Sequence, residues 1–238
     1  MKRGDYLWAV ALMTIVGLLL NPNTHAPIMH ATRLHPFLMG FTKFAVLASL
    51  GELLAVRVVE RRWSLPCGMI YRTVVWGFIG FCLVAIFAIF SNGVADALQL
   101  GLLPDGNSSS SLIRAIWTSA LLNLAFGPVM MCGHRILDTY IDLAGGRLAN
   151  LRTVKLEQVI EHIQWPDLIK FVCIKMLVFF WIPAHTITFL LPADYRLLYA
   201  ASLSLFLGVI LAAAKRARRG ERQMGSLVEL PAARSAEI

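Results

Sequence analysis

Charged residues are scarce in this sequence. Only 15% of its 238 residues are Asp, Glu, Lys or Arg, whereas 58% are hydrophobic, and the mean hydropathy is +0.67. In an ordinary soluble domain roughly half of the residues are apolar and about a quarter are charged. The shortage of charge therefore excludes an ordinary soluble domain and indicates a membrane protein.

Short segments of alternating polarity, which transmembrane β-barrels need, are also lacking. The chain instead has several apolar runs of about 20 residues, the length that a helix needs to cross a hydrocarbon core of about 30 Å. These runs predict an all-α fold, a polytopic transmembrane helix bundle with six spans and kinked helices. The predicted spans are Tyr6–Leu20, Phe37–Val56, Met69–Phe90, Leu112–Cys132, Leu168–Leu190 and Leu197–Ala214. They form one domain over residues 1–214, and residues 215–238 are predicted to be a disordered basic tail.

The first apolar run has a second interpretation. It follows Lys2 and Arg3 and ends near Thr24, His25 and Ala26, which is the arrangement of a cleavable signal peptide. Thr24 is a weaker residue than Ala three positions before a cleavage site. We therefore favour a first span and keep the signal peptide as the alternative.

Basic residues gather at the N-terminus and after the second, fourth and sixth predicted spans. They are Lys2, Arg3, Arg57, Arg61, Arg62, Arg135, Arg147, Arg152, Lys155, Lys215, Arg216, Arg218, Arg219 and Arg222. Because Lys and Arg are retained on the cytoplasmic side, this bias predicts that both termini lie inside. The net charge of +8 is then mostly an orientation signal, and no basic face interleaved with aromatics predicts a nucleic-acid partner. The absence of an Arg-rich and Ser-rich transit peptide favours a bacterial cytoplasmic membrane over an organelle membrane.

Sequence motifs of catalysis and cofactor binding are missing as well. The chain contains no HExxH, GxSxG, P-loop or Gly-rich dinucleotide turn. Its four cysteines have no zinc-site spacing and are expected to be small buried residues: Cys67, Cys82, Cys132 and Cys173. The sequence therefore predicts no enzyme, no cofactor and no metal.

Ionisable residues inside the spans are candidates for function, because they cost free energy in lipid. Glu52 shares a helical face with small residues that let helices approach closely, namely Ala45, Ala48, Ser49 and Ala55, with Gly51 beside it. We expect Glu52 to face a neighbouring helix, where it either pairs with Arg57 or Arg72 or lines a polar path. Such small-residue faces also offer a route to oligomerisation. Lys43, on the opposite side of the same helix, is expected to snorkel to the outer surface.

The fifth predicted span contains an unusual polar stretch. Lys175 lies about a third of the way along it, where it either snorkels to the inner interface or lines a path. Pro183 lacks an N–H and frees the carbonyl of Phe179, so we expect a kink there. His185 and Thr186 follow the kink, and threonine hydroxyls can bond freed carbonyls. These groups either line a pathway or brace the kink.

The fourth predicted span has a similar break at Gly127–Pro128. Beyond it, His134, Asp138 and Asp142 recur every four residues along one helical face. A hydrogen-bonded cluster of the histidine with the carboxylates is favoured here over a metal site, because no further ligand is evident.

The connection from Asp142 to Asp167 is charged but has periodic apolar residues. These are Leu151, Val154, Ile160 and Ile163. The pattern predicts an amphipathic segment that rests on the inner membrane surface.

Several short stretches resemble the Mpv/PMP family of peroxisomal and mitochondrial inner-membrane proteins. They are HPFLMGFTKFAVLASLGELLA, YRTVVWGFIG, NLAFGPVMMCGHRILD and IKMLVFFWIPAHTITFLLPADYRLLYAASLSLFLGVILA. The matching positions are Pro36, Gly51 with Glu52, Arg72 with Thr73, Pro183 and Arg196, within residues 36–214. The chain departs from the family where Glu52 replaces Asp, where Val56 replaces a usual Gln, and where a Trp-Asn pair is missing around Phe206 and Gly208. The family is usually drawn with four spans, and a prokaryotic-type relative fits this chain.

The resemblance implies a small channel or solute-permeability protein, in which Glu52, Lys175 and His185 line a polar path between broken helices. The full set of pore-lining or buried-polar candidates is Glu52, Arg72, His134, Asp138, Lys175, His185 and Thr186. The expected partners are the lipid bilayer and small solutes. The alternative is a non-conducting membrane scaffold that organises proteins or lipids through its inner basic loops.

Overall fold

The computed structural model describes residues 3–105, 110–208 and 210, and the regular elements within these ranges are all helices. In chain order they are α1 Arg3–Leu20, α2 Pro22–Leu34, α3 Pro36–Glu60, α4 Met69–Gln99, α5 Ser111–Leu121, η1 Leu122–Phe126, α6 Gly127–Leu143, α7 Leu148–Leu151, α8 Leu156–His162, α9 Trp165–Asp167, η2 Leu168–Trp181 and α10 Ile182–Leu190. A last helix follows over residues 193–208. The predicted all-α fold is confirmed.

Five of the helical segments are long and apolar enough to cross a membrane. They are Arg3–Leu20, Pro36–Glu60, Met69–Gln99, Ser111–Leu143 and Trp165–Leu190, and they match the first five predicted spans. The chain is therefore a multi-pass membrane protein built as a helix bundle. The predicted sixth span, Leu197–Ala214, falls partly outside the described residues, and the predicted tail over residues 215–238 falls wholly outside them.

All five spans are longer than predicted, and two of them are much longer. The fourth continues past Cys132 to Leu143, and α4 continues past Phe90 to Gln99. At a rise of about 1.5 Å per residue, the 31 residues of α4 extend about 46 Å, which exceeds the thickness of a hydrocarbon core. The residues after Phe90 are more polar, which is why the predicted span ended there. They remain helical because this part of α4 still packs against the protein, as the burial of Val94 shows.

The centre of the bundle is α3, which approaches two helices closely through glycines. A Cβ on Gly40 would lie 2.8 Å from the Gly80 carbonyl oxygen of α4, and a Cβ on Gly51 would lie 2.8 Å from the Ser204 carbonyl oxygen of the last helix. Ser49 Oγ and Thr73 Oγ1 lie 2.8 Å apart and join α3 to α4. The small-residue face of α3 thus packs against α4 and the last helix.

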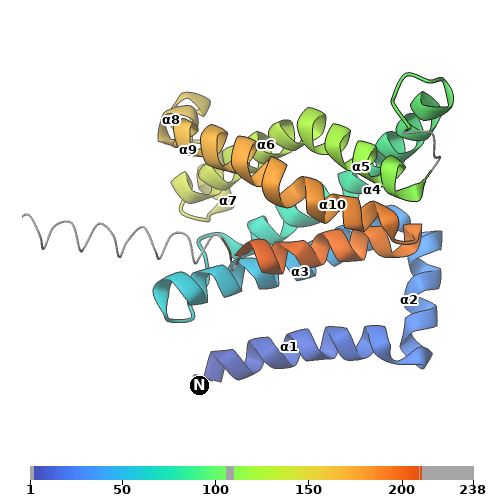
Figure 1. Cartoon of the computed structure of the whole chain (residues 1–238). Coiled ribbons are helices and arrows are strands. Elements are labelled where there is room, and N and C mark those ends of the chain that lie inside the picture. Colours follow the sequence, from blue (N-terminus) through green and yellow to red (C-terminus); the bar gives the residue numbers. More distant parts are fainter. Residues whose placement is uncertain (1–2, 106–109, 209, 211–238) are drawn as a thin grey trace, which may run out of the picture.

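Helix α1 lies beside the bundle and buries none of its residues (Figure 1). Its N-terminal turn is fastened through Asp5, which accepts hydrogen bonds from Arg57 Nε at 2.7 Å and from Trp63 Nε1 at 2.8 Å. Trp8 Nε1 also donates to the Leu50 carbonyl at 3.0 Å. Arg57 is therefore committed to α1 and does not pair with Glu52.

Helix α2, which lies between the first two predicted spans, runs across one end of the bundle (Figure 1). Its start follows from local chemistry, because the Asn21 side chain accepts the N–H of Asn23 and a proline occupies the first turn. The Lys43 amine is buried beneath α2 and donates to Thr32 Oγ1 at 3.0 Å. The prediction that Lys43 snorkels to the surface is therefore wrong, because α2 covers it.

The opposite end of the bundle, where α3 ends and α4 begins, carries the arginine-rich loops and is called the basic end. There the chain between α6 and η2 folds into α7, α8 and α9. Val159 and Ile163 pack inward, whereas Ile160 remains 44% exposed. The predicted segment is amphipathic, but its buried face differs from the one expected.

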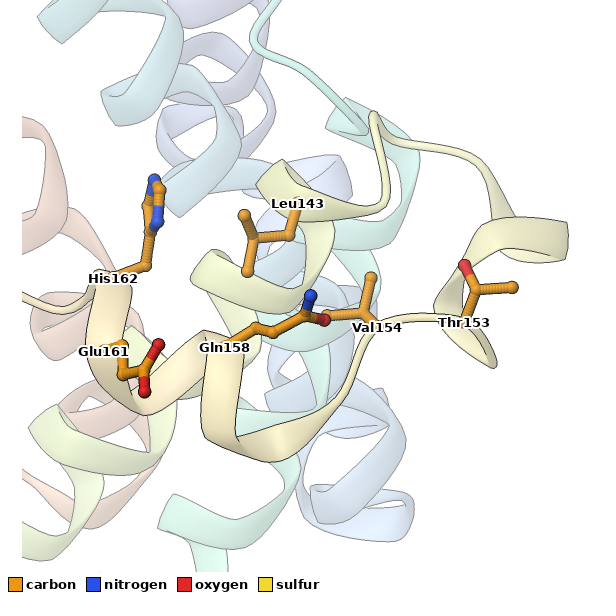
Figure 2. Close-up of a pocket in the computed structure, with 6 residues that line it drawn as sticks. All are labelled: Leu143, Thr153, Val154, Gln158, Glu161 and His162. Carbon is orange, nitrogen blue, oxygen red and sulfur yellow. The ribbon is translucent and has the colours of Figure 1, made fainter.

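A surface pocket of about 470 Å³ lies beside this segment. It is lined by Leu143, Thr153, Val154, Gln158, Glu161 and His162 (Figure 2).

Candidate functional site

Two spans contain π-helical segments that end two residues before a proline, the five residues of η1 before Pro128 and the 14 residues of η2 before Pro183. Before Pro128, the Gly127 N–H bonds the Leu122 carbonyl, and before Pro183, the Ile182 N–H bonds the Leu177 carbonyl. Both bonds reach five residues back instead of four. Widened turns of this kind make room for a ring that has no N–H to donate, and they recur at functional sites. Both predicted breaks are therefore present.

The two breaks meet inside the bundle. Asn123 Nδ2, on η1, lies 3.0 Å from His185 Nδ1, on α10. Ser119 Oγ donates to the Ile182 carbonyl at 2.6 Å, directly beside Pro183. Ser119, Asn123 and His185 are all buried, and we call them the His185 cluster. A neutral hydrogen-bonded network thus joins one broken helix to the other.

The His185 ring is held between aromatic side chains. Trp181 stacks on it with ring centroids 5.1 Å apart and an interplanar angle of 28°, and Phe87 meets it edge-on at 5.8 Å. This clamp fixes the ring orientation that the bond to Asn123 requires.

Thr186 has a bracing position. Its hydroxyl donates to the Ile182 carbonyl at 2.8 Å, and Thr188 donates to the Ala184 carbonyl at 3.0 Å. These carbonyls lie four residues back from each threonine, so neither hydroxyl reaches the Phe179 carbonyl that Pro183 was expected to free. Both threonines stabilise the turn after the proline instead.

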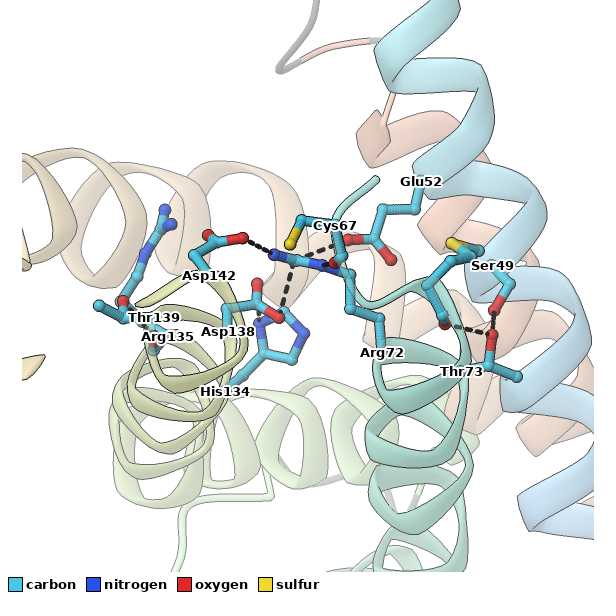
Figure 3. A network of polar contacts seen from close by, with 11 residues as sticks. Ser49, Glu52, Cys67, Arg72, Thr73, His134, Arg135, Asp138, Thr139 and Asp142 are labelled. Carbon is cyan, nitrogen blue, oxygen red and sulfur yellow. Dashed lines mark hydrogen bonds and ion pairs between the residues drawn. The ribbon is translucent and has the colours of Figure 1, made fainter. Parts of the chain in front are cut away.

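A second group of polar side chains surrounds Arg72 at the basic end (Figure 3). Its guanidinium contacts Glu52 on α3 at 3.0 Å, and Asp138 and Asp142 on α6 at 3.0 Å and 2.6 Å. Arg72 Nε also donates to the Cys67 carbonyl at 2.9 Å. The expected pairing of Glu52 with a nearby arginine is confirmed for Arg72.

His134 completes this group. Its Nδ1 lies 3.6 Å from Asp138 Oδ2, and its ring packs over Trp76 with centroids 4.3 Å apart. We call Glu52, Arg72, His134, Asp138 and Asp142 the Arg72 cluster. Three carboxylates face one guanidinium, so the cluster carries an excess of negative charge when its acids are ionised. Within the described ranges no group of three or more His, Cys, Asp or Glu residues could hold a metal ion.

A cavity of about 270 Å³ occupies the centre of the bundle and connects the two clusters. It is bounded by α3, α4, η1, α6, η2, α10 and the last helix. Most of its wall is apolar, and its polar lining consists of Glu52, Asn123, His134, Arg135, Asp138, His185 and Ser204, together with the tryptophans Trp76 and Trp181. The charged members all belong to the basic end, because Glu52 lies on the far half of α3 and Arg135 and Asp138 on the far half of α6.

Several polar atoms of the lining residues are unsatisfied. His134 Nε2 and Trp181 Nε1 are buried and have no hydrogen-bond partner among the described residues. Glu52 Oε2 and Trp76 Nε1 are buried too, and the only interaction available to them in this part of the chain is a poorly aligned one with each other. Buried polar groups are nearly always paired, so such exceptions mark strain or a place for a bound molecule. Their concentration around one cavity makes it the candidate functional site.

The cavity does not extend to the end of the bundle that α2 covers. A packed core lies between, made of Phe44, Leu47, Leu83, Phe87, Ala115, Leu122, Phe189, Leu197, Ala200 and Ala201. Arg196 braces this core, because its guanidinium donates to the Leu191 and Phe189 carbonyls at 3.0 Å and 3.2 Å.

The structure brings together most of the residues predicted for the site, with one clear exception. Glu52, Arg72, His134 and Asp138 share one cluster, and His185 lines the same cavity. Lys175 does not belong with them, because its side chain is exposed on η2. Of the two alternatives for Lys175, lining the path is wrong, since the inner face of η2 is formed by neighbours such as Leu177, and an exposed side chain agrees with snorkelling.

Sequence reasoning missed two residues at the centre of the site, Asn123 and Trp181. Asn123 is a polar amide inside a predicted span, four residues before Gly127, and that signal was available. Trp181 gave no signal, because an aromatic residue in an apolar run is ordinary.

Comparisons of the chain with protein-family models, with curated proteins and with solved structures find no match. The resemblance to the Mpv/PMP family therefore depends on the sequence motifs alone and stays a prediction. Of the motif residues, Glu52 and Arg72 lie in the Arg72 cluster and Thr73 lies next to it, bonded to Ser49.

Proposed function

We propose that this chain is a small channel or solute-permeability protein of the Mpv/PMP type, with its path along the centre of the bundle. The single observation that supports the proposal is the central cavity, which is bounded by four of the five spans and by the last helix and is lined by unsatisfied polar atoms. The proposed setting is a bacterial cytoplasmic membrane, with the basic end and both termini inside.

An anchor or a scaffold has no need of such a cavity. Protein interiors are close-packed, and each unpaired polar group in an apolar interior costs free energy. Filling this space with leucines would stabilise a bundle whose only task is to span the membrane. A polar cavity that is maintained at this cost is consistent with a molecule that enters it.

The described conformation corresponds to a path that is closed at the end covered by α2. Passage would require the aromatic contact between Phe87 and Phe189, whose ring centroids are 5.1 Å apart, to open. His185, two residues after Pro183, meets Phe87 edge-on, so the break at Pro183 lies next to this contact, and both breaks supply places where the helices can bend. We propose that the two broken spans move and that the paired helices α3 and α4 stay fixed.

The test is solute flux into liposomes that contain the purified protein. Met130 lines the cavity, and a Met130→Trp substitution fills part of it, so most of the flux should be lost. Met13 is 66% exposed on α1, so Met13→Trp makes the same change outside the bundle and should leave flux intact. Circular dichroism of both variants shows whether they are folded.

Two outcomes would contradict the channel. One is equal flux in both variants, and the other is no flux from well-folded wild-type protein with any solute of a size range that the cavity admits. The second outcome would favour the scaffold, for which the short helices α7 to α9 at the basic end would be the surface to examine for partners.

A further inference from the structure

We propose that the central cavity binds a small uncharged solute of the polyol class, whose hydroxyl groups both donate and accept hydrogen bonds. This inference deepens the proposed function by naming the solute class. Binding does not depend on conduction, so the site can be tested even if the path never opens.

The distribution of charge around the cavity argues against an ion as the occupant. Charged lining residues are confined to the basic end, where Arg72 already pairs with the carboxylates of Glu52 and Asp138. Farther in, the wall consists of uncharged groups such as Leu122 and Leu177. An ion that moved there would lose its hydration without meeting a counter-charge, which is costly in an apolar interior.

The unsatisfied atoms require a partner that both donates and accepts. Trp181 is 8% exposed, and its Nε1 can only donate. Glu52 Oε2 can accept, and His134 Nε2 can do either according to its protonation. A hydroxyl group satisfies either kind of atom, so a molecule with several hydroxyls can pair at both ends of the cavity.

The His185 cluster lies beside Trp181, which stacks on the His185 ring. Asn123 Nδ2 lies 3.0 Å from His185 Nδ1 and also donates to the Ser119 carbonyl at 2.8 Å. The same Nδ1 lies 3.2 Å from Asn123 Oδ1, so either tautomer of the ring makes a hydrogen bond to this amide. The inner end of the cavity thus offers the donor Trp181 Nε1, and the basic end offers both the acceptor Glu52 Oε2 and the donor Trp76 Nε1.

The remaining wall suits the carbon skeleton of such a solute. Its apolar surface includes Phe126, Met130, Met131 and Met176. Small-molecule sites are commonly apolar clefts with a few placed polar groups, and methionines adapt to irregular shapes. A volume of about 270 Å³ has room for several waters or for a solute of a few heavy atoms.

The experiment measures binding and permeation separately, with glycerol and erythritol as the probes. Saturation-transfer NMR on the detergent-solubilised full chain measures binding, and light scattering after an osmotic step measures entry into proteoliposomes. Potassium chloride is the ionic comparison. We expect both polyols to bind and to enter faster than the salt.

Trp181→Phe tests the site, because it removes the indole N–H and keeps a ring to stack on His185. We expect polyol binding to weaken about fivefold, as for the loss of one hydrogen bond. Trp117→Phe is the matched control, since that indole donates to the Pro104 carbonyl at 3.0 Å on the exposed surface. Its polyol binding should equal that of the wild type.

The outcomes separate this inference from the proposed function. Polyol binding without flux of any solute would support the site and contradict the channel. Flux of potassium chloride that equals or exceeds polyol flux would overturn the solute class and leave the channel standing. Absence of polyol binding, or equal weakening by Trp181→Phe and Trp117→Phe, would overturn the site.

Discussion

The Arg72 cluster and the His185 cluster both bury polar groups in the bundle, but the first consists mainly of charged side chains and the second of neutral ones. The first joins α3, α4 and α6 through ions at the basic end, with a guanidinium whose side chain is 8% exposed. The second joins η1 and α10 through neutral groups and a backbone carbonyl. The ionic cluster fixes helices around the basic end, whereas the neutral cluster links the two spans at their breaks.

This difference in chemistry implies a difference in tolerance. A buried ion that loses its partner keeps a large desolvation cost, whereas a neutral group that loses its partner costs only a hydrogen bond. Neutral contacts can therefore be exchanged for contacts to a solute more cheaply than ion pairs can. We expect the His185 cluster to rearrange during function and the Arg72 cluster to hold the bundle together.

The sharpest test of the ionic cluster is Arg72→Met. It leaves Glu52, Asp138 and Asp142 facing one another without a cation, so the free energy of unfolding should fall by about 3–5 kcal/mol. Thermal unfolding in detergent micelles, followed by circular dichroism, measures the change. Arg57→Met is the matched control at the same end, because its pair with Asp5 is partly exposed, and its effect should be clearly smaller. Equal losses in the two variants would show that Arg72 does not hold the helices together.

The corresponding change in the neutral cluster is Asn123→Leu. It keeps the side-chain volume but leaves His185 Nδ1 buried without its partner, so we expect a loss of about 1–3 kcal/mol in the free energy of unfolding. Asn150→Leu is the control, because that amide bonds the Ala144 carbonyl on the surface at 3.1 Å. A loss as large as that of Arg72→Met would remove the distinction between the two clusters.

Within the ionic cluster, Glu52→Gln should have a small effect. Arg72 keeps Asp138 and Asp142, and the substitution removes part of the excess negative charge, so we expect a change of about 1 kcal/mol or less in the free energy of unfolding. The same thermal measurement applies. A loss approaching that of Arg72→Met would mean that the cluster depends on Glu52 individually rather than on Arg72.

Sequence reasoning reached the ionic cluster and only half of the neutral one. Glu52 lies on a helical face of small residues, and His134, Asp138 and Asp142 recur every four residues, so regular helical geometry predicted which groups face inward. The inward faces of α3 and α6 place Glu52 on one side of Arg72 and Asp138 and Asp142 on the other. Regular periodicity is a sound guide where the helical turns are unbroken.

The neutral cluster could not be predicted in the same way. One π turn rotates the later residues by about 100° relative to a continuous α-helix. In η2 the π-helical pattern continues over 14 residues, which include Lys175, so the faces no longer follow the α-helical period. The faces of residues such as His185 and Lys175 therefore depend on breaks whose exact form no spacing rule gives. The meeting of Asn123 with His185 needed the three-dimensional arrangement of both broken spans.

The first two helices differ in how well the sequence indicated them. Helix α1 was evident from its apolar run, but its sparse contact with the bundle was not, because an apolar helix can face lipid as readily as protein. Helix α2 was not among the predicted spans, and its segment contains Pro22 and Pro27 and few apolar residues. Asn21 followed by Pro22 is a regular start for a helix, and that signal outweighs the polar composition.

The smallest expected effect comes from Lys175→Met. Lys175 belongs to neither cluster and is exposed on η2, so the substitution should change neither the free energy of unfolding nor solute flux beyond measurement error. Flux into proteoliposomes, measured beside Met130→Trp, provides the comparison within one experiment. If Lys175→Met abolished flux and Met130→Trp did not, the solute would pass along the outer face of η2, and the central cavity would have to be given up as the path.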